Sequence, residues 1–322
     1  MTLAFTFGGG MAMDAPGTAL CDRFPILGDW MRQVADWTGI AADRLLTEDF
    51  TAAFYSGDVS VQPDLRFVAE VRQAAYSIGL ADVLADRGIL PDVIGGSSLG
   101  FMIGATLAGA IDRRELFGYL RASTELPLHP EGEAPRAVAI CVVAHELGLE
   151  GYLDGQPGVH LACEVGQFID GAHGMYMFTG YVDALQSLAA RKAPGEVNVV
   201  TALGGAHSPL QQFHHDLMAP HVAAMTFTDP RIPVISGLSD RTLTTAAEIR
   251  TDLERNSTTS TAMYHVLRGL ARHETRLALV LGVSSATDLF AFPFPVYPVV
   301  TAEDFDGLGA AVYDAGVMPT FG

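Results

Sequence analysis

Apolar residues along the chain follow two spacings, one typical of helices and one typical of strands. Alternation at residues 3–7 and the β-branched pair at 93–94 predict two short buried strands. Elsewhere in the first half, apolar side chains recur every three or four positions. That spacing predicts helices over residues 24–37, 64–84 and 112–126, the last capped by Asp112. Strands and helices in this order predict an α/β fold.

The pattern changes after a polar, proline-bearing link at residues 127–135. It predicts strands at 137–143, 159–165, 175–179 and 197–201, with helices at 145–153 and 181–191. This β-α-β-β-α-β order is typical of a ferredoxin-like unit. We therefore predict a small ferredoxin-like subdomain over residues 137–203, inserted into a larger subdomain built from residues 1–136 and 204–322.

Four further elements are expected in the last third, before an irregular end. They are strands at 232–236 and 277–281 and helices at 246–253 and 262–272. Another helix is expected to follow residue 210 and run to Met225. Prolines recur after Phe290, so this tail is predicted to be irregular and packed on the surface.

Composition narrows the function classes. Hydrophobic residues make up 49% and charged residues 17% of 322 residues, which suits a large buried core. The formal net charge of −18 argues against nucleic acid or an anionic membrane surface as partner. The three cysteines lack metal-ligand spacing, so no metal site is predicted, and their sparse use suits a reducing cytoplasm. The N-terminus lacks the basic region of a signal peptide.

The strongest chemical signal is G-S-S-L-G at residues 96–100, between a predicted strand and a glycine-dotted apolar helix. This is the context of a nucleophile elbow, whose glycines permit a tight turn with Ser98 at its tip. Such a motif also arises by chance or through close helix–strand packing. The uncharged stretch from 93 to 111 raises the question of a membrane span, but its five glycines favour a buried strand and helix.

Two further stretches carry possible chemistry. Three glycines at 8–10 follow the first strand and fit either a flexible turn or a loop that lends backbone N–H groups to an oxyanion hole. They do not fit the phosphate-binding glycine motifs. His207 lies in G-A-H-S-P-L at residues 205–210 and is a candidate base for Ser98. His214 and His215 are expected on the surface of the following helix.

With these motifs in order, the chain resembles the malonyl-coenzyme A:acyl carrier protein transacylases, the acyltransferases of fatty acid and polyketide synthesis, over nearly its whole length. The family motif F-P-G-Q-G resembles residues 7–10, where the proline is missing and Gly9 replaces glutamine. The family elbow G-H-S-L-G resembles residues 96–100, with Ser97 for histidine. The histidine motif, often A-F-H-S-P-L, resembles residues 205–210, with Ala206 for phenylalanine.

The resemblance implies a fold and a set of roles. The fold is an α/β-hydrolase-like core with an inserted ferredoxin-like small subdomain. Ser98 would carry the acyl group as an ester and His207 would act as its base. Backbone N–H groups of Gly9 and Leu99 would form the oxyanion hole, and a carbonyl near Asn256 would orient the histidine. No permanently bound cofactor is implied; phosphopantetheine thioesters, on coenzyme A or on an acyl carrier protein, would be the substrates.

The chain departs from the family in its acyl pocket, assigned to Ser97, Ser123 and Ala206. An ungapped match places Ser123 where the family holds the malonyl carboxylate with an arginine. Arg121, two positions earlier on the same helix, would face nearly the opposite side. A pocket without a cation and with extra room is therefore expected. It would favour a neutral or bulkier acyl group over malonyl.

The leading interpretation is a discrete acyltransferase that moves a non-malonyl acyl group to or from a carrier protein in polyketide-type synthesis. Three alternatives stay open: a hydrolase that clears acyl groups from carriers, an ordinary malonyl transacylase, and a catalytically idle carrier-binding module. Because carriers of this kind are usually acidic, docking would need a local basic patch. Arg268, Arg272 and Arg276, spaced as on one helix face, are candidates, as are Arg113 and Arg114.

Overall fold

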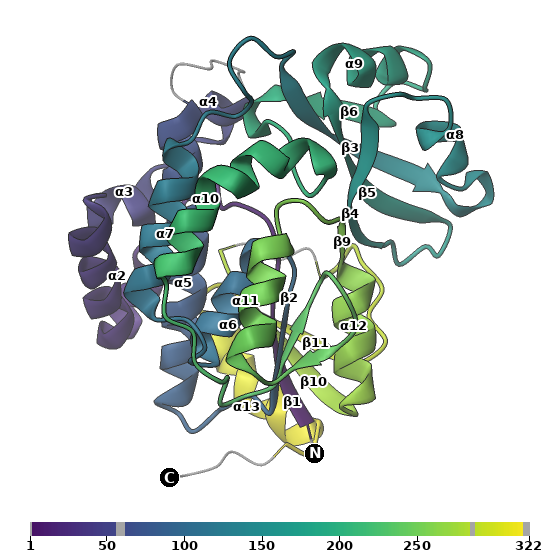
Figure 1. Ribbon diagram of the computed structural model, residues 1–322. Helices are drawn as coiled ribbons and strands as arrows, with labels where there is room; N and C mark the ends of the chain where they lie inside the picture. The colour runs from purple at the N-terminus through teal and green to yellow at the C-terminus, as the bar shows by residue number, and fades with distance from the viewer. Residues whose placement is uncertain (1, 56–61, 284–286, 318–322) are drawn as a thin grey trace.

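The computed structural model describes residues 2–55, 62–283 and 287–317, and its strands there form two sheets (Figure 1). The first sheet has the strand order β11-β10-β1-β2-β7-β8. Its neighbours pair in parallel, except that β8 pairs antiparallel to β7. These strands are β1 (Thr2–Phe7), β2 (Val93–Gly96), β7 (Val234–Ser236), β8 (Thr242–Leu243), β10 (Thr275–Leu281) and β11 (Val296–Val299).

Helices cover both faces of this sheet. Successive side chains along its strands point to opposite faces, and apolar side chains are buried on both. Leu3 and Phe5 of β1 enter a large core with α2 (Pro25–Thr38), α5 (Gln62–Ala85), α6 (Leu99–Leu107) and α7 (Arg113–Glu125). Ala4, between them in sequence, packs on the opposite face against α12 (Met263–Arg272). The other helices outside residues 137–203 are α1 (Ala19–Arg23), α3 (Ala42–Thr47), α4 (Thr51–Tyr55), α10 (Gln212–Ala224), α11 (Ala246–Arg255) and α13 (Asp304–Asp314).

The second sheet has the order β6-β3-β5-β4-β9. Its first four strands pair antiparallel, in the arrangement of a ferredoxin-like unit. They are β3 (Arg136–Ala144), β4 (Val159–Gln167), β5 (His173–Tyr181) and β6 (Val197–Val200), accompanied by α8 (Glu150–Leu153) and α9 (Val182–Ala190). The short β9 (Thr261–Ala262) joins from the other part of the chain and pairs in parallel with β4. The predicted division at residues 137–203 agrees with this sheet but stays a prediction.

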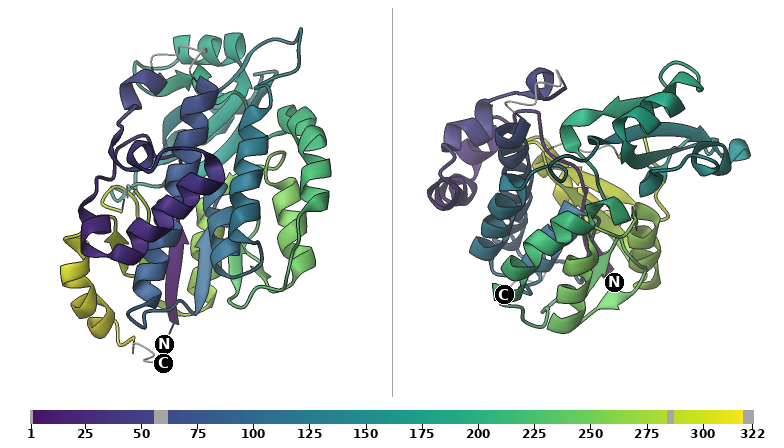
Figure 2. Two further views of the ribbon diagram at one scale, coloured as in Figure 1. Left: turned by 90° about the vertical axis from the view of Figure 1, so that its left-hand side faces the viewer. Right: turned by 45° about the horizontal axis from the view of Figure 1, so that its top comes forward.

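The second sheet lies beyond the carboxyl ends of the parallel strands of the first, as Figures 1 and 2 show from three directions. One of its faces packs on α8 and α9 through residues such as Ala139 and Phe178. The other face, with Ile140 and Met177, turns toward a cavity. A register shift after Leu161 of β4 turns the following odd-numbered residues to the cavity side. The cavity therefore lies where loops after the parallel strands meet the second sheet.

Two expectations about the chain's elements have clear outcomes. Asp112 caps α7 as predicted, because its carboxylate accepts the backbone N–H groups of Arg114 and Glu115. The prediction of an irregular tail after Phe290 is wrong. Residues 296–299 form β11 at the sheet edge, where a proline is tolerated, and α13 follows. Within the described residues, no helix has the length and apolar character needed to span a membrane.

Arg72 of α5 connects the segment after the glycine loop, residues 13–14, to α3 through hydrogen bonds. It is fully buried on α5, and its guanidinium donates to the carbonyls of Met13 (2.8 Å), Asp14 (2.9 Å) and Leu45 (2.9 Å). The centre of the Phe50 ring lies 4.4 Å from the guanidinium carbon. Met13 lines the cavity described below, so this buried cation supports one of its walls.

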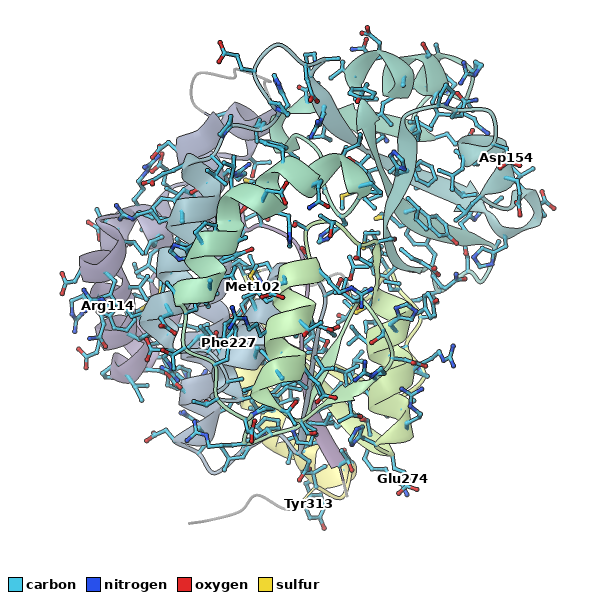
Figure 3. All side chains as sticks on the ribbon, viewed as in Figure 1. Met102, Arg114, Asp154, Phe227, Glu274 and Tyr313 are labelled. Atoms are coloured by element: carbon cyan, nitrogen blue, oxygen red, sulfur yellow. The ribbon has the colours of Figure 1, made fainter. Side chains whose placement is uncertain are left out.

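Replacing Arg72 by leucine is expected to lower the free energy of unfolding by about 3–5 kcal/mol, because several buried carbonyls lose their donor. Urea denaturation measures this change. Arg114→Leu is the matched control, since Arg114 is exposed on the outside of the molecule (Figure 3), and its effect should stay within about 0.5 kcal/mol. Equal stability of the two variants would contradict the assigned role of Arg72.

Candidate active site

Ser98 stands in a strained turn between β2 and α6. Its backbone has φ 56° and ψ −120°, a conformation that costs a non-glycine residue about 1–3 kcal/mol. A Cβ on Gly96 would lie 2.2 Å from the carbonyl oxygen of Gly100, and one on Gly100 would lie 2.3 Å from that of Phe7. Only glycines permit this approach, so the turn has the geometry that the elbow motif predicts.

His207 lies directly against Ser98. The Ser98 hydroxyl donates to His207 Nε2 over 2.8 Å, and His207 Nδ1–H donates to the backbone carbonyl of Asn256 over 2.5 Å. The N–H of Ser208 also donates to the carbonyl of Ser257, at 3.1 Å. The histidine loop is thus attached at two points to the segment after α11. Since a carbonyl only accepts, the bond to Asn256 selects the tautomer whose Nε2 is free to take a proton.

The environment of His207 keeps its imidazole neutral. The residue is only 8% exposed, and burial lowers the pKa of His207, while the hydrogen bond to Asn256 opposes that shift. A neutral imidazole beside a serine hydroxyl is able to accept its proton as the oxygen attacks an electrophile. The arrangement is chemically suited to nucleophilic catalysis.

Gly9 and Leu99 flank Ser98. A Cβ on Gly9 would lie 2.7 Å from the Ser97 carbonyl oxygen and 3.0 Å from Ser98 Cβ, so the glycine loop passes directly beside the elbow. Leu99 is the first residue of α6, where backbone N–H groups lack partners inside the helix. Their assignment as an oxyanion hole stays a prediction.

A cavity of about 480 Å³ opens at Ser98 and His207. Ser97, Ser123 and Ala206, the three residues assigned to the acyl pocket, all line it. Ser97 is buried there and its hydroxyl lies 2.9 Å from that of Thr261. Methionine dominates the apolar walls, with Met11, Met13, Met102, Met175, Met177 and Met263; Figure 3 labels Met102 in the interior. Such flexible side chains adapt to ligands of different shape.

The expectation of a pocket without a cation is wrong. Arg66 of α5 lines the cavity and donates from Nη2 to the backbone carbonyl of Ser123, at 3.0 Å. Glu70, one turn further along α5, lies 3.8 Å from Arg66 Nε and lines the same cavity. The cation comes from α5, whereas the resemblance implies an arginine on α7, at the position of Ser123. The sequence signal for it was an oppositely charged pair at i, i+4 on the helix predicted over residues 64–84.

The expectation that His214 lies on the surface is also wrong. His214 lines the cavity, and its Nε2 lies 3.2 Å from Ser123 Oγ. Burial and the nearby Arg66 lower the pKa of His214. Its neighbour His215 is half-buried and donates from Nδ1 to the carbonyl of Glu254, at 2.8 Å. Because α10 packs against α7, only one of the two histidines reaches the cavity.

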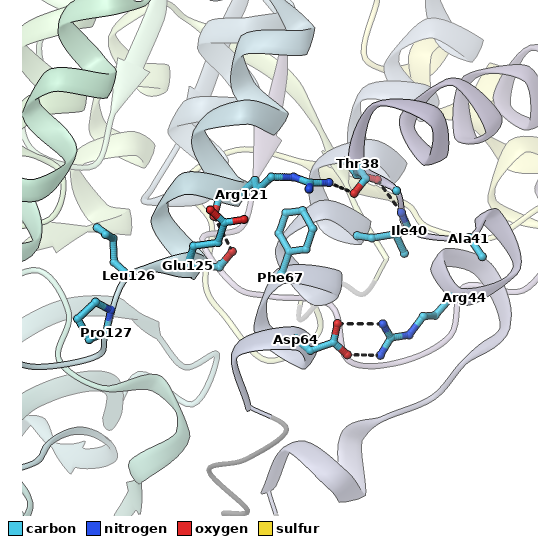
Figure 4. A pocket seen from close by; sticks show the side chains of 12 residues that line it. Thr38, Ile40, Ala41, Arg44, Asp64, Phe67, Arg121, Glu125, Leu126 and Pro127 are labelled. Carbon is cyan, nitrogen blue, oxygen red and sulfur yellow. Dashed lines mark hydrogen bonds and ion pairs between the residues drawn. The ribbon is translucent and has the colours of Figure 1, made fainter.

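Arg121 faces away from the cavity of Ser98, as its helical position predicts. It donates to the carbonyl of Thr38 and lies 5.3 Å from the ring centre of Phe67 (Figure 4). There it lines a separate cavity of about 640 Å³ with the ion pair of Arg44 and Asp64. Arg121 therefore does not supply a cation next to Ser98.

The proposed basic patch is not a single helix face. Arg268 and Arg272 lie on α12, and both pair with Asp240, at 3.2 Å and 2.6 Å. Arg276 lies on β10, because the helix ends at Arg272 and Glu274 takes a positive φ before the strand. Arg113 pairs with Asp82, at 2.6 Å. The prediction assumed free arginines on one helix face. Three of the five candidates are paired with aspartates and a fourth, Arg276, lies off the helix, while Arg114 is exposed.

Possible metal ligands are not gathered in the described part of the chain: no group of three or more His, Cys, Asp or Glu residues there is arranged to hold an ion. Cys163 lines the cavity near Ser98, and burial raises the pKa of its thiol to about 12. A thiol that stays protonated is a poor nucleophile. The chemistry of the cavity therefore centres on Ser98.

Comparison with known proteins identifies the fold. No family model and no curated protein matches the chain. Among solved structures, an acyl carrier protein S-malonyltransferase from Vibrio cholerae has a TM-score of 0.78 at 17% identity, covering 96% of this chain and 100% of that one. The Bartonella henselae acyl-carrier-protein S-malonyltransferase has a TM-score of 0.76 at 19% identity, covering 98% and 100%.

A third similar structure is a malonyl-transacylase in complex with its type II polyketide synthase acyl-carrier protein. It has a TM-score of 0.75 at 17% identity and covers 95% of this chain and 98% of that one. The chain thus has the fold of the malonyl transacylases over nearly its whole length. The predicted combination of an α/β-hydrolase-like core and a ferredoxin-like small subdomain is confirmed.

Proposed function

We propose that the protein is an acyltransferase that moves an acyl group between a thioester and the phosphopantetheine thiol of an acyl carrier protein. The observation that carries this proposal is the 2.8 Å contact between Ser98 Oγ and His207 Nε2, two residues that line a cavity of about 480 Å³. The fold adds support, because the similar solved structures are acyl carrier protein malonyltransferases.

The reaction follows in two half-steps. His207 Nε2 takes the Ser98 proton as Oγ attacks the thioester carbonyl, and the N–H groups of Gly9 and Leu99 would stabilise the resulting oxyanion. Collapse of that intermediate releases the first thiol, which receives the proton from His207. A second thiol then attacks the Ser98 ester by the same path in reverse, giving ping-pong kinetics. The bond to Asn256 holds the imidazole in place throughout.

This chemistry needs no permanently bound cofactor, since the thioesters themselves carry the acyl group. The preferred partner is an acyl carrier protein, as one similar transacylase was solved with its carrier. For the acyl group itself, a cavity of about 480 Å³ with methionine-rich walls supports a chain larger and less polar than malonyl. Ordinary malonyl transfer is the alternative, and Arg66 is the residue that would favour it.

The proposal is tested by loading the protein with a panel of acyl thioesters and following intact mass. An adduct at Ser98 that a carrier thiol removes faster than water supports the transferase. Faster removal by water would point to the hydrolase alternative. Formation of no adduct with any thioester would contradict the proposal. Competition between malonyl and butyryl thioesters measures the acyl preference.

Enlarging Ala206 should restrict the acyl chain. Ala206→Phe places a ring inside the cavity, so we expect loading of hexanoyl thioester to fall by about 10–200-fold relative to acetyl. The ratio of the two second-order loading rates is the measurement. Ala206→Gly, which leaves the space open, should keep the original ratio. An unchanged ratio in Ala206→Phe would mean that the chain does not pass Ala206.

A further inference from the structure

A group of charged and polar side chains lines the cavity together with the methionines. Arg66 and Glu70 come from α5, Tyr119 and Ser123 from α7, and His214 from α10. The serine links two of them, because its carbonyl accepts from Arg66 and its hydroxyl meets His214. Three helices that are separate in the sequence thus bring these polar side chains together in the wall of the cavity.

The guanidinium of Arg66 is only partly satisfied. Its side chain is 12% exposed, and Nη2 donates to the Ser123 carbonyl. Within the described ranges, buried Nε has no hydrogen-bond partner, since Glu70 Oε1 lies 3.8 Å away. The guanidinium, which lines the cavity, therefore keeps the capacity for a further hydrogen bond.

Glu70 decides whether an anion is able to use that capacity. An ionised Glu70 balances the positive charge of the Arg66 guanidinium. A carboxylate that approached Arg66 would then also approach a second carboxylate inside a poorly solvated space, where like charges repel strongly. With Glu70 neutral, the same cation would face the entering group alone.

We propose that Arg66 and Glu70 together set the charge of the acyl group: the ionised pair excludes an acyl chain ending in a carboxylate and admits an uncharged one. The proposal rests on the acyl transfer proposed above and adds the substrate class. Neutralising Glu70 without changing its shape should convert Arg66 into a carboxylate-binding residue and admit a malonyl group.

The pH dependence gives an independent expectation. Burial raises the pKa of Glu70 to about 7, and Arg66 opposes the rise. Besides Arg66 on the same helix, Tyr119 of α7 faces Glu70, and His214 of α10 lies near Arg66. Burial raises the pKa of Tyr119 and lowers that of His214, so both stay neutral near pH 7. The preference for malonyl over butyryl should therefore rise as pH falls through about 7.

The experiment compares malonyl and butyryl thioesters in four proteins: unmodified, Glu70→Gln, Glu70→Gln with Arg66→Met, and Arg121→Gln. Intact mass after single-turnover loading gives the malonyl-to-butyryl ratio for each. Glu70→Gln should raise the malonyl-to-butyryl ratio by about tenfold or more. It should also remove the change of this ratio between pH 6 and 8, a range of about one unit on each side of the Glu70 pKa. The double variant should lose the gain. Arg121→Gln, whose arginine lines the other cavity, should keep the original ratio.

Binding separates this proposal from the catalytic one. The same charge substitutions are made in a Ser98→Ala protein, and calorimetry measures its affinity for malonyl- and butyryl-coenzyme A. Suppose that the proteins with Ser98 form no acyl adduct, but Glu70→Gln in the Ser98→Ala protein still shifts affinity toward malonyl-coenzyme A. The charge selection then stands and the proposed reaction fails. If adducts form and Glu70→Gln changes neither the malonyl-to-butyryl loading ratio nor the ratio of the two affinities, the charge selection is overturned while the acyl transfer stands.

Discussion

Replacing Ser98 by alanine is expected to abolish the acyl adduct and all thioester-dependent transfer. Ser98 is the hydroxyl at the tip of the elbow, and its Oγ is the atom in contact with His207 Nε2, at 2.8 Å. Without this oxygen no ester forms, so the two half-reactions lose their shared intermediate. Intact mass after incubation with acyl thioesters, followed by peptide mapping, measures the loss.

The neighbouring serine provides the control for this experiment. Ser97 lies in the same turn, but its hydroxyl contacts that of Thr261 and not His207. Ser97→Ala keeps the Ser98 hydroxyl and should still form an adduct that maps to Ser98. An adduct that persists in Ser98→Ala, or that maps to another residue in the unmodified protein, would remove Ser98 from the mechanism.

His207→Ala should slow acylation of Ser98 by roughly 10²–10⁴-fold, the usual contribution of a positioned general base. Alanine leaves the serine proton without an acceptor and removes the bond to the Asn256 carbonyl. The first-order rate of adduct formation under saturating butyryl thioester is the measurement. Rapid-quench sampling separates this step from the later deacylation.

His215→Ala is the matched control, because His215 donates to the carbonyl of Glu254 and is absent from the lining of the cavity. Its acylation rate should remain within about twofold of the original, as expected when no group of the reaction site is altered. A loss of less than tenfold in His207→Ala would assign the role of the base to another residue.

Local sequence patterns predicted most of the elements because neighbouring residues create them. The capping carboxylate of Asp112 needs only the next three residues to start α7. The elbow at Ser98 needs only glycines at positions 96 and 100. Alternation in β3 likewise anticipates a strand with two different faces. The tail after Phe290 was harder, since β11 forms only by pairing with β10.

The contact between Ser98 and His207 joins positions that are 109 residues apart. A resemblance to known motifs made the pair a reasonable prediction, but the sequence alone carries no distance between them. Their approach depends on β2 and on the attachment of the histidine loop to Asn256 and Ser257. The placement of the small sheet over the carboxyl ends of the parallel strands then closes the cavity around them.

The amino-acid sequence by itself determined the elbow, most of the elements and the apolar character of the chain, because these depend on short-range spacing and composition. The charge inside the cavity was decided by tertiary structure. Arg66, Ser123 and His214 lie on three helices, and only the packing of α5 and α10 against α7 brings them together. A helix position predicts the direction of a side chain around its own axis, but which neighbouring helix supplies a buried cation is determined by the packing of all three.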